Sequence, residues 1–275
     1  MRSSWSIVVV VALCHQAHAE VATYGIQRTH VGNTPLWRDG STIVLTLDAD
    51  TIPANARPAI AAAAAAWRTA SASCSELSFA IDVRVPGEDD HDTVHLRTDH
   101  WCPPGGGACF APDAASVTTL TYVDDPSDPD DGKILGADVE LNAVDFELLV
   151  PGATAATTKP ALDLQSVVTH ELGHVLGLAH DCGTGQEPWP TDELGRRVPA
   201  CAAAAPAVTT ATMYVRIQPD DLGGRTPEAG DVAGACSTVR PSPDDNEVTG
   251  GCSAGAGSGL GFVVVFVGLL RRRRL

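Results

Sequence analysis

The stretch that decides the fold is VVTHELGHVLGLAHDCG, which runs from Val167 to Gly183. It places three histidines and one glutamate within a largely apolar run. Either this is a buried helix that is rich in histidine, or its polar side chains converge on a metal ion. A buried helix would leave Glu171 and two imidazoles without partners, at a cost of about 1–3 kcal/mol for each unsatisfied group. The metal site is therefore the favoured interpretation.

The spacing of the polar residues predicts how such a site is built. His170 and His174 are four residues apart, so on a helix both imidazoles project from one face and can share an ion. Glu171 is offset from His170 by about 100° of helical rotation, which favours contact with a water on the ion over direct ligation. A catalytic zinc keeps three protein ligands and one open position, so a third ligand is needed.

That third ligand requires a bend in the chain. On a continued helix His180 would point away from the other two histidines, but Gly177 can adopt a left-handed conformation and end the helix before it. We therefore predict that His170, His174 and His180 hold one catalytic zinc ion.

The same residues carry a family resemblance. H-E-x-x-H-x-x-G-x-x-H is the signature of the metzincin zinc proteases, and THELGHVLGLAHD matches it at every fixed position. The family also places a methionine in a tight turn beneath the zinc, and TTATMYVRIQPDD supplies Met213. The resemblance implies that Glu171 is the catalytic base, that Met213 packs under the ligands, and that Tyr214 is a candidate for transition-state contact.

The resemblance also implies a fold. A metzincin domain is α+β, with a twisted, mostly parallel five-stranded sheet, an antiparallel edge strand, two long helices and a C-terminal helix. The strand order looks like the matrixin branch: SVTTLTYV (116–123) would be the edge strand that lines the cleft, and GADVELN (136–142) the strand before the active-site helix. TPEAGDVAGAC resembles the matrixin C-terminal helix.

Some positions depart from the matrixin pattern. Asp181 follows the third histidine where matrixins more often carry serine and adamalysins carry aspartate, and Val215 replaces a common proline. The cysteine-switch propeptide of matrixins is absent. Four residues lie in the part of the chain where matrixins hold a structural zinc, but we do not assign them a metal: His91, Asp92, His95 and His100.

Residue patterns predict the remaining elements. Alternation or β-branched composition predicts strands over 41–50, 77–85, 92–101, 116–123 and 136–142. The alanine-rich segment 54–73 predicts a helix with Trp67 on the core. Pro160 or Asp163 can begin the active-site helix, residues 182–211 are expected to be irregular, and 226–239 predicts a short final helix.

The net negative charge of the chain limits the classes of molecule that it is expected to bind. Five of the 18 basic residues lie at the ends of the 275-residue chain, so residues 20–252 hold 13 basic and 34 acidic residues, a net charge of −21. This argues against nucleic acid, which requires concentrated Lys and Arg. The acidic insert Asp124–Lys133 could hold calcium through oxygen ligands, but it lacks EF-hand spacing, and a solvated loop is the favoured interpretation.

Both ends resemble processing signals. Residues 1–19 have a basic residue, a short apolar run and an A-x-A site, which predicts a signal peptide and export. Residues 20–240 would form the catalytic domain, 241–251 a linker, and 252–275 a tail. The tail resembles the myxobacterial C-terminal sorting tail, in which the cysteine at the position of Cys252 is the processing and anchoring point; a plain transmembrane anchor is the alternative. We expect a monomer at the cell surface or outer envelope, held by this tail or released.

Six cysteines lie between the two processing signals: Cys74, Cys102, Cys109, Cys182, Cys201 and Cys236. An even number in an exported protein favours three disulfides, for which 15 pairings are possible. Closeness in sequence favours Cys102 with Cys109 and Cys182 with Cys201, which leaves Cys74 with Cys236. A four-cysteine zinc site is disfavoured because the chain has no C-x-x-C pair.

The first functional hypothesis is an exported zinc endopeptidase that binds an extended protein or peptide substrate along strand 116–123. The second is a non-catalytic, zinc-stabilised surface module for binding or adhesion.

Overall fold

The computed structural model describes residues 22–240 except 41, 88–89, 104–105 and 220. The predicted signal peptide, linker and sorting tail, with Cys252, therefore lie outside the described residues. Within the described part of the chain, no helix combines the length and the apolar character that a bilayer crossing needs.

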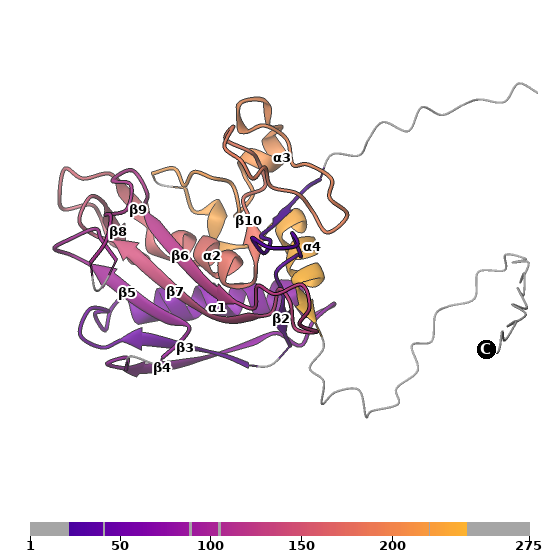
Figure 1. Ribbon diagram of the computed structural model, residues 1–275. Helices are drawn as coiled ribbons and strands as arrows, with labels where there is room; N and C mark the ends of the chain where they lie inside the picture. The colour runs from indigo at the N-terminus through magenta and orange to yellow at the C-terminus, as the bar shows by residue number, and fades with distance from the viewer. Residues whose placement is uncertain (1–21, 41, 88–89, 104–105, 220, 241–275) are drawn as a thin grey trace, which may run out of the picture.

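A five-stranded sheet forms the main layer (Figure 1). Its strands are β4 (Ser78–Arg84), β3 (Thr42–Asp48), β5 (Thr93–Arg97), β7 (Ile134–Asn142) and β6 (Ser116–Tyr122), in that spatial order. The first four are parallel to their neighbours, and β6 runs antiparallel to β7 at one edge. This confirms the predicted α+β class and the mostly parallel sheet with an antiparallel edge strand.

Two helices pack on one face of this sheet, α1 (Arg57–Ser71) and α2 (Leu164–Val175) (Figure 1). They are joined at Trp67 of α1, which is fully buried and donates a hydrogen bond from Nε1 to the carbonyl of Thr169 at 2.7 Å. The smaller helical elements are η1 (Cys201–Ala203), α3 (Pro206–Thr209), η2 (Gly223–Arg225) and α4 (Ala229–Thr238). The last of these is the predicted final helix.

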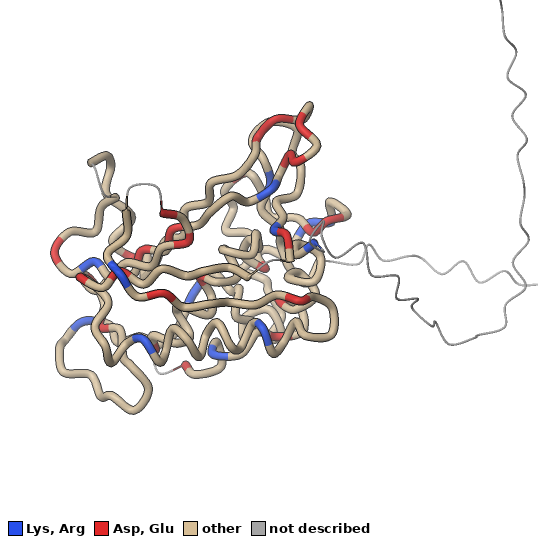
Figure 2. The backbone as a smooth tube through the Cα atoms, turned by 90° about the horizontal axis from the view of Figure 1, so that it is seen from below, with Lys and Arg blue, Asp and Glu red and all other residues tan. Residues whose placement is uncertain are grey.

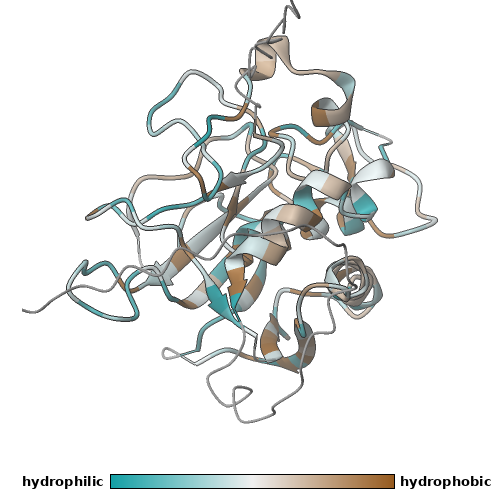
Figure 3. Ribbon diagram, turned by 90° about the vertical axis from the view of Figure 1, so that its right-hand side faces the viewer, coloured by the Kyte–Doolittle hydropathy of each residue, from teal (hydrophilic) through white to brown (hydrophobic). Residues whose placement is uncertain are grey.

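The hydrophobic core lies between the sheet and the helices. In β3, Ile43 and Leu45 are buried while Val44 between them is 48% exposed, because alternate side chains point to opposite faces. Ile43 and Leu45 belong to the same buried cluster as Ile60 of α1 and Leu172 of α2. Several of the surrounding loops are hydrophilic (Figure 3).

One predicted boundary was wrong in detail: the strand predicted over 92–101 ends at Arg97. Of the two predicted starts of the active-site helix, Asp163 is the one observed, because β9 (Ala161–Asp163) first pairs in parallel with β8 (Glu147–Leu149). Asp163 then serves as the N-cap.

Two further strand pairs link distant parts of the chain, and sequence periodicity did not indicate them. β1 (Gly25–Ile26) pairs antiparallel with β10 (Leu178–Ala179). β2 (Arg38–Asp39) pairs in parallel with β11 (Val239–Arg240). The first pair holds the segment that leads from Gly177 to His180.

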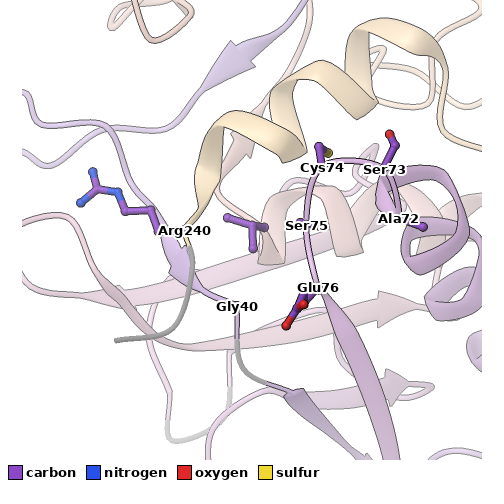
Figure 4. Close-up of a pocket in the computed structure, with 8 residues that line it drawn as sticks. Gly40, Ala72, Ser73, Cys74, Ser75, Glu76 and Arg240 are labelled. Carbon is purple, nitrogen blue, oxygen red and sulfur yellow. The ribbon is translucent and has the colours of Figure 1, made fainter. Parts of the chain in front are cut away.

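The six cysteines form three disulfides in the pairing favoured by the sequence: Cys74–Cys236, Cys102–Cys109 and Cys182–Cys201. The first joins the loop after α1 to α4. A pocket of about 380 Å³ opens beside it, between residues 72–76 and the 239–240 segment (Figure 4). None of the predicted site residues lines this pocket.

Acidic residues occur in several loops, and basic residues are scattered over loops and helices (Figure 2). The acidic insert forms a turn-rich loop whose carboxylates accept hydrogen bonds from within the loop and from the N-terminal segment. Asp124 accepts the backbone N–H of Val31, and Asp131 accepts the Thr34 hydroxyl and the Asp125 N–H. Calcium binding there stays the less favoured alternative to a solvated loop.

Candidate metal centre

Helix α2 carries the first two histidines and Glu171. Its N-terminus is fixed by Asp163, whose carboxylate accepts the backbone N–H of Ser166 at 2.8 Å and pairs with Arg225. An N-cap of this kind satisfies one of the free donors of the first turn. Four apolar residues of the helix are fully buried in the core: Val167, Val168, Leu172 and Val175.

The chain bends after this helix, as the sequence predicted. Helix α2 ends at Val175, and Gly177 has φ of +91°, a left-handed conformation that favours glycine. The space is also limited, since a Cβ at this position would lie 3.2 Å from Cδ1 of Ile134 and 3.3 Å from the carbonyl of Leu36. The pairing of β10 with β1 then carries the chain to His180.

The bend brings the three predicted ligands together. The ring centroid of His170 lies 4.8 Å from that of His174 and 5.2 Å from that of His180, and the centroids of His174 and His180 lie 5.0 Å apart. One nitrogen from each ring lies within 4.8 Å of the others, a spacing that can hold one metal ion. Among the described residues, this is the only group of three or more His, Cys, Asp or Glu side chains whose ligand atoms lie this close together.

Backbone carbonyls fix the protonation of two of the rings. Nδ1 of His170 lies 2.6 Å from the carbonyl of Thr212, and Nδ1 of His174 lies 2.8 Å from that of Leu178. Because a carbonyl only accepts, each Nδ1 carries the hydrogen and each Nε2 keeps its lone pair. Metal-ligating histidines are usually held by this second hydrogen bond.

The surroundings also keep His170 and His180 neutral. Burial, followed by the proximity of His174, lowers the pKa of His170 to about 4. Burial, followed by the neighbouring His174 and His170, lowers the pKa of His180 well below its usual value. Neutral imidazole is the form that binds metal, so this pocket is prepared for a cation near neutral pH.

The donor set fits zinc. Three neutral imidazole nitrogens with oriented second hydrogen bonds match the three-histidine ligand set of catalytic zinc sites. Imidazole also suits copper, iron and nickel, so the three histidines could hold a metal ion of this group.

Glu171 is buried beside the histidines, 3% exposed. Its two carboxylate oxygens accept hydrogen bonds from two hydroxyls of β6, Ser116 Oγ to Oε1 and Thr118 Oγ1 to Oε2, both at 2.5 Å. The sequence prediction missed these partners. One feature of the sequence could have indicated them: Ser116 and Thr118 are two residues apart in a predicted strand, so both hydroxyls lie on one face, where apolar side chains are expected.

Met213 lies in the turn below α2. It is fully buried, and its sulfur fills the space next to Gly173, between the two helical histidines in sequence. The backbone N–H of Asp181 donates to the carbonyl of Met213 at 3.2 Å, which links this turn to the third ligand. Tyr214 follows and is half-buried.

Two buried aspartates lie behind the third ligand. Asp231 of α4 accepts backbone N–H groups from Thr212, Met213 and Glu228. Asp181 is fully buried, and neither of its carboxylate oxygens has a hydrogen-bond partner among the described residues. Burial, followed by the nearby Asp231, raises the pKa of Asp181 to about 7.

In the second histidine-containing segment, residues 91–100, His95 and Asp92 contact neighbouring protein side chains. His95 lies 3.1 Å from both Asp48 Oδ2 and Thr93 Oγ1, and Asp92 forms an ion pair with Arg38. The sheet thus uses these side chains for its own packing.

In comparisons with known proteins, no protein-family model and no curated protein matches this chain.

Proposed function

We propose that this chain is a zinc-dependent endopeptidase of the metzincin type. One observation carries the proposal: three histidines that can hold a metal converge beside a buried glutamate, with the order and spacing of H-E-x-x-H-x-x-G-x-x-H. The metal ligands would be His170, His174 and His180.

Bound by these three nitrogens, zinc would make water acidic and polarise the carbonyl of the bond to be cut. Glu171 would then act as the general base: it accepts the proton of the attacking water and delivers that proton to the leaving amine. Its burial supports this role, since a carboxylate held away from bulk solvent keeps a defined orientation.

The substrate would be an extended segment of a protein. β6 is an edge strand of the described sheet, with β7 on one side and no sheet partner on the other. Such an edge can pair with a peptide main chain. Ser116 and Thr118 point from this strand to Glu171, so a peptide paired with β6 would lie close to the proposed base.

The remaining assignments extend the proposal. Met213 would support the ligand cluster from below, and Tyr214 would contact the transition state. Export by residues 1–19 and anchoring through Cys252 would place a monomeric enzyme at the cell surface or outer envelope, or release it from there.

The test is zinc content together with cleavage of an unstructured protein such as casein. We expect one zinc per chain and cleavage that is lost in Glu171→Ala, a variant that should keep its zinc because Glu171 is not a proposed ligand. Glu76→Ala, which changes an exposed acid, is the control and should cleave normally. A wild type that binds zinc but cleaves neither casein nor a peptide library would favour the non-catalytic module.

A further inference from the structure

The strand next to α2 holds both oxygens of Glu171. Ser116 Oγ donates to Oε1 and Thr118 Oγ1 donates to Oε2, each at 2.5 Å. Each carboxylate oxygen therefore has its own hydroxyl donor. The side chain they hold is the general base of the proposed reaction.

The pleat of β6 explains how two hydroxyls reach one carboxylate. Ser116 and Thr118 are two residues apart, so their side chains leave the strand on the same face. Their register partners in β7 are Leu141 and Val139, which are buried in the core. This face of β6 is therefore the one that faces α2.

Hydroxyls on a core-facing surface need partners, because burying an unpaired hydroxyl is unfavourable. Leu120, the next residue on this face, is apolar and packs against the core. The change from apolar to hydroxyl side chains thus coincides with the position of Glu171. A purely apolar strand would leave the buried carboxylate without these two donors.

Two hydroxyl donors suit a general base. Each carboxylate oxygen has more than one lone pair, so Glu171 can accept a hydroxyl hydrogen bond and still accept a proton from water. Two donors on two different oxygens oppose rotation of the carboxylate about its last bond. Hydroxyls also add no positive charge that would compete with a metal ion.

We propose that Ser116 and Thr118 are positioning residues that hold the carboxylate of Glu171 in the orientation needed for proton transfer. This proposal rests on the proposed function, since it assigns a role within the same reaction. The two residues act through Glu171 and do not take part in proton transfer themselves.

The experiment uses the full chain and compares variants that lack the hydroxyls of Ser116 and Thr118 with variants that keep them. Ser116→Ala and Thr118→Val remove one hydroxyl each, and Ser116→Thr and Thr118→Ser keep them. Thr51→Val is the matched control, because the Thr51 hydroxyl also donates to a carboxylate, Asp48 Oδ2 at 2.8 Å, outside the proposed site. Zinc content, thermal unfolding, kcat and KM are measured for each variant with a fluorogenic peptide.

We expect kcat to fall about tenfold for each hydroxyl removed and about a hundredfold for both, as is typical when a catalytic group is misplaced. KM and zinc content should change by less than about twofold, and the hydroxyl-retaining variants should recover kcat to within about threefold. A fall in kcat no larger than that of Thr51→Val, or no rescue by Thr118→Ser, would overturn the proposal. If Thr118→Val does not fold, Ser116→Ala and Thr118→Ser decide the question.

Crystal structures of wild type and the Ser116→Ala/Thr118→Val variant give a readout that does not depend on activity. The carboxylate of Glu171 should have one orientation in wild type and a rotated or mixed one in the variant. An unchanged orientation would overturn the positioning role. A wild type that cleaves no peptide would instead contradict the proposed function, and the crystal structures would then decide the positioning role alone.

Discussion

The sulfur of Met213 occupies the space that a side chain at Gly173 would need: an ideal Cβ on Gly173 would lie 2.2 Å from it. Gly173 lies between His170 and His174, so the methionine supports the helix at the point where it presents two proposed ligands. The same Cβ would lie 3.0 Å from Trp67 Cζ2, which leaves little room for adjustment. The glycine of HELGH thus has a packing role.

Gly173→Ala should therefore be destabilising. Overpacking of a filled core costs about 1–3 kcal/mol, and a displaced Met213 should also weaken metal binding. Urea unfolding and zinc competition with a chelator measure both effects. Gly87→Ala is the control, because a Cβ at this position would come no closer than 3.5 Å to another atom, Asp90 Oδ2. Equal behaviour of the two variants would contradict the packing role.

Comparing Gly177→Ala with Gly185→Ala should distinguish a general loss of stability caused by backbone strain from a specific loss of zinc affinity. A left-handed alanine costs about 1–2 kcal/mol, and the strain falls at the bend that carries His180. Gly185 has a similar φ of +95° with open space around it, so Gly185→Ala carries comparable strain away from the bend. We expect both variants to lose stability, measured by urea unfolding, but only Gly177→Ala to bind zinc about tenfold more weakly. Unchanged zinc affinity in Gly177→Ala would show that the bend does not depend on glycine.

Asp163→Asn should change how stability depends on pH. Burial raises the pKa of Asp163, but hydrogen bonds from Arg225 and Ser166 outweigh it and leave the pKa below its usual value. A lowered pKa in the folded state adds stability above the unfolded pKa of about 3.9, and this stability is lost as pH falls through the folded pKa.

Asparagine keeps the N-cap but loses the charge. We expect Asp163→Asn to be less stable than wild type by about 1 kcal/mol at pH 6, with the difference shrinking below pH 4. Urea unfolding of metal-free protein at several pH values measures this. A difference that stays constant with pH would exclude the ion pair as its cause.

The disulfides should differ in their contributions. Cys74–Cys236 spans 162 residues, whereas Cys102–Cys109 spans seven. In the chain-entropy model, removal of the first pair costs about 5 kcal/mol and removal of the second about 2 kcal/mol. Denaturant unfolding of the two double-serine variants tests the order; a larger loss from the short loop would contradict it.

The sequence predicted much of the sheet and the convergence of the three histidines, because both depend on local patterns. The strands that became β3, β4, β6 and β7 have clear alternation or β-branched composition. The histidines and Gly177 follow from helical geometry alone. These predictions needed no knowledge of distant contacts.

Other features depend on contacts that a local pattern does not contain. β1 and β10 have two residues each, too few for periodicity to reveal. The hydrogen bonds from Ser116 and Thr118 to Glu171 depend on the register of β6 and the placement of α2. The burial of Asp181 near Asp231 likewise depends on α4 packing behind the bend.

The most direct test of zinc-dependent proteolysis is the rate of peptide cleavage as zinc is added back to chelator-treated full-length protein. We expect no cleavage without metal, then a rate that rises in proportion to zinc and levels off at one zinc per chain, with Glu171→Gln inactive throughout. Cleavage that persists without metal, or no cleavage at any zinc ratio despite bound zinc, would show that the protein is not a zinc peptidase.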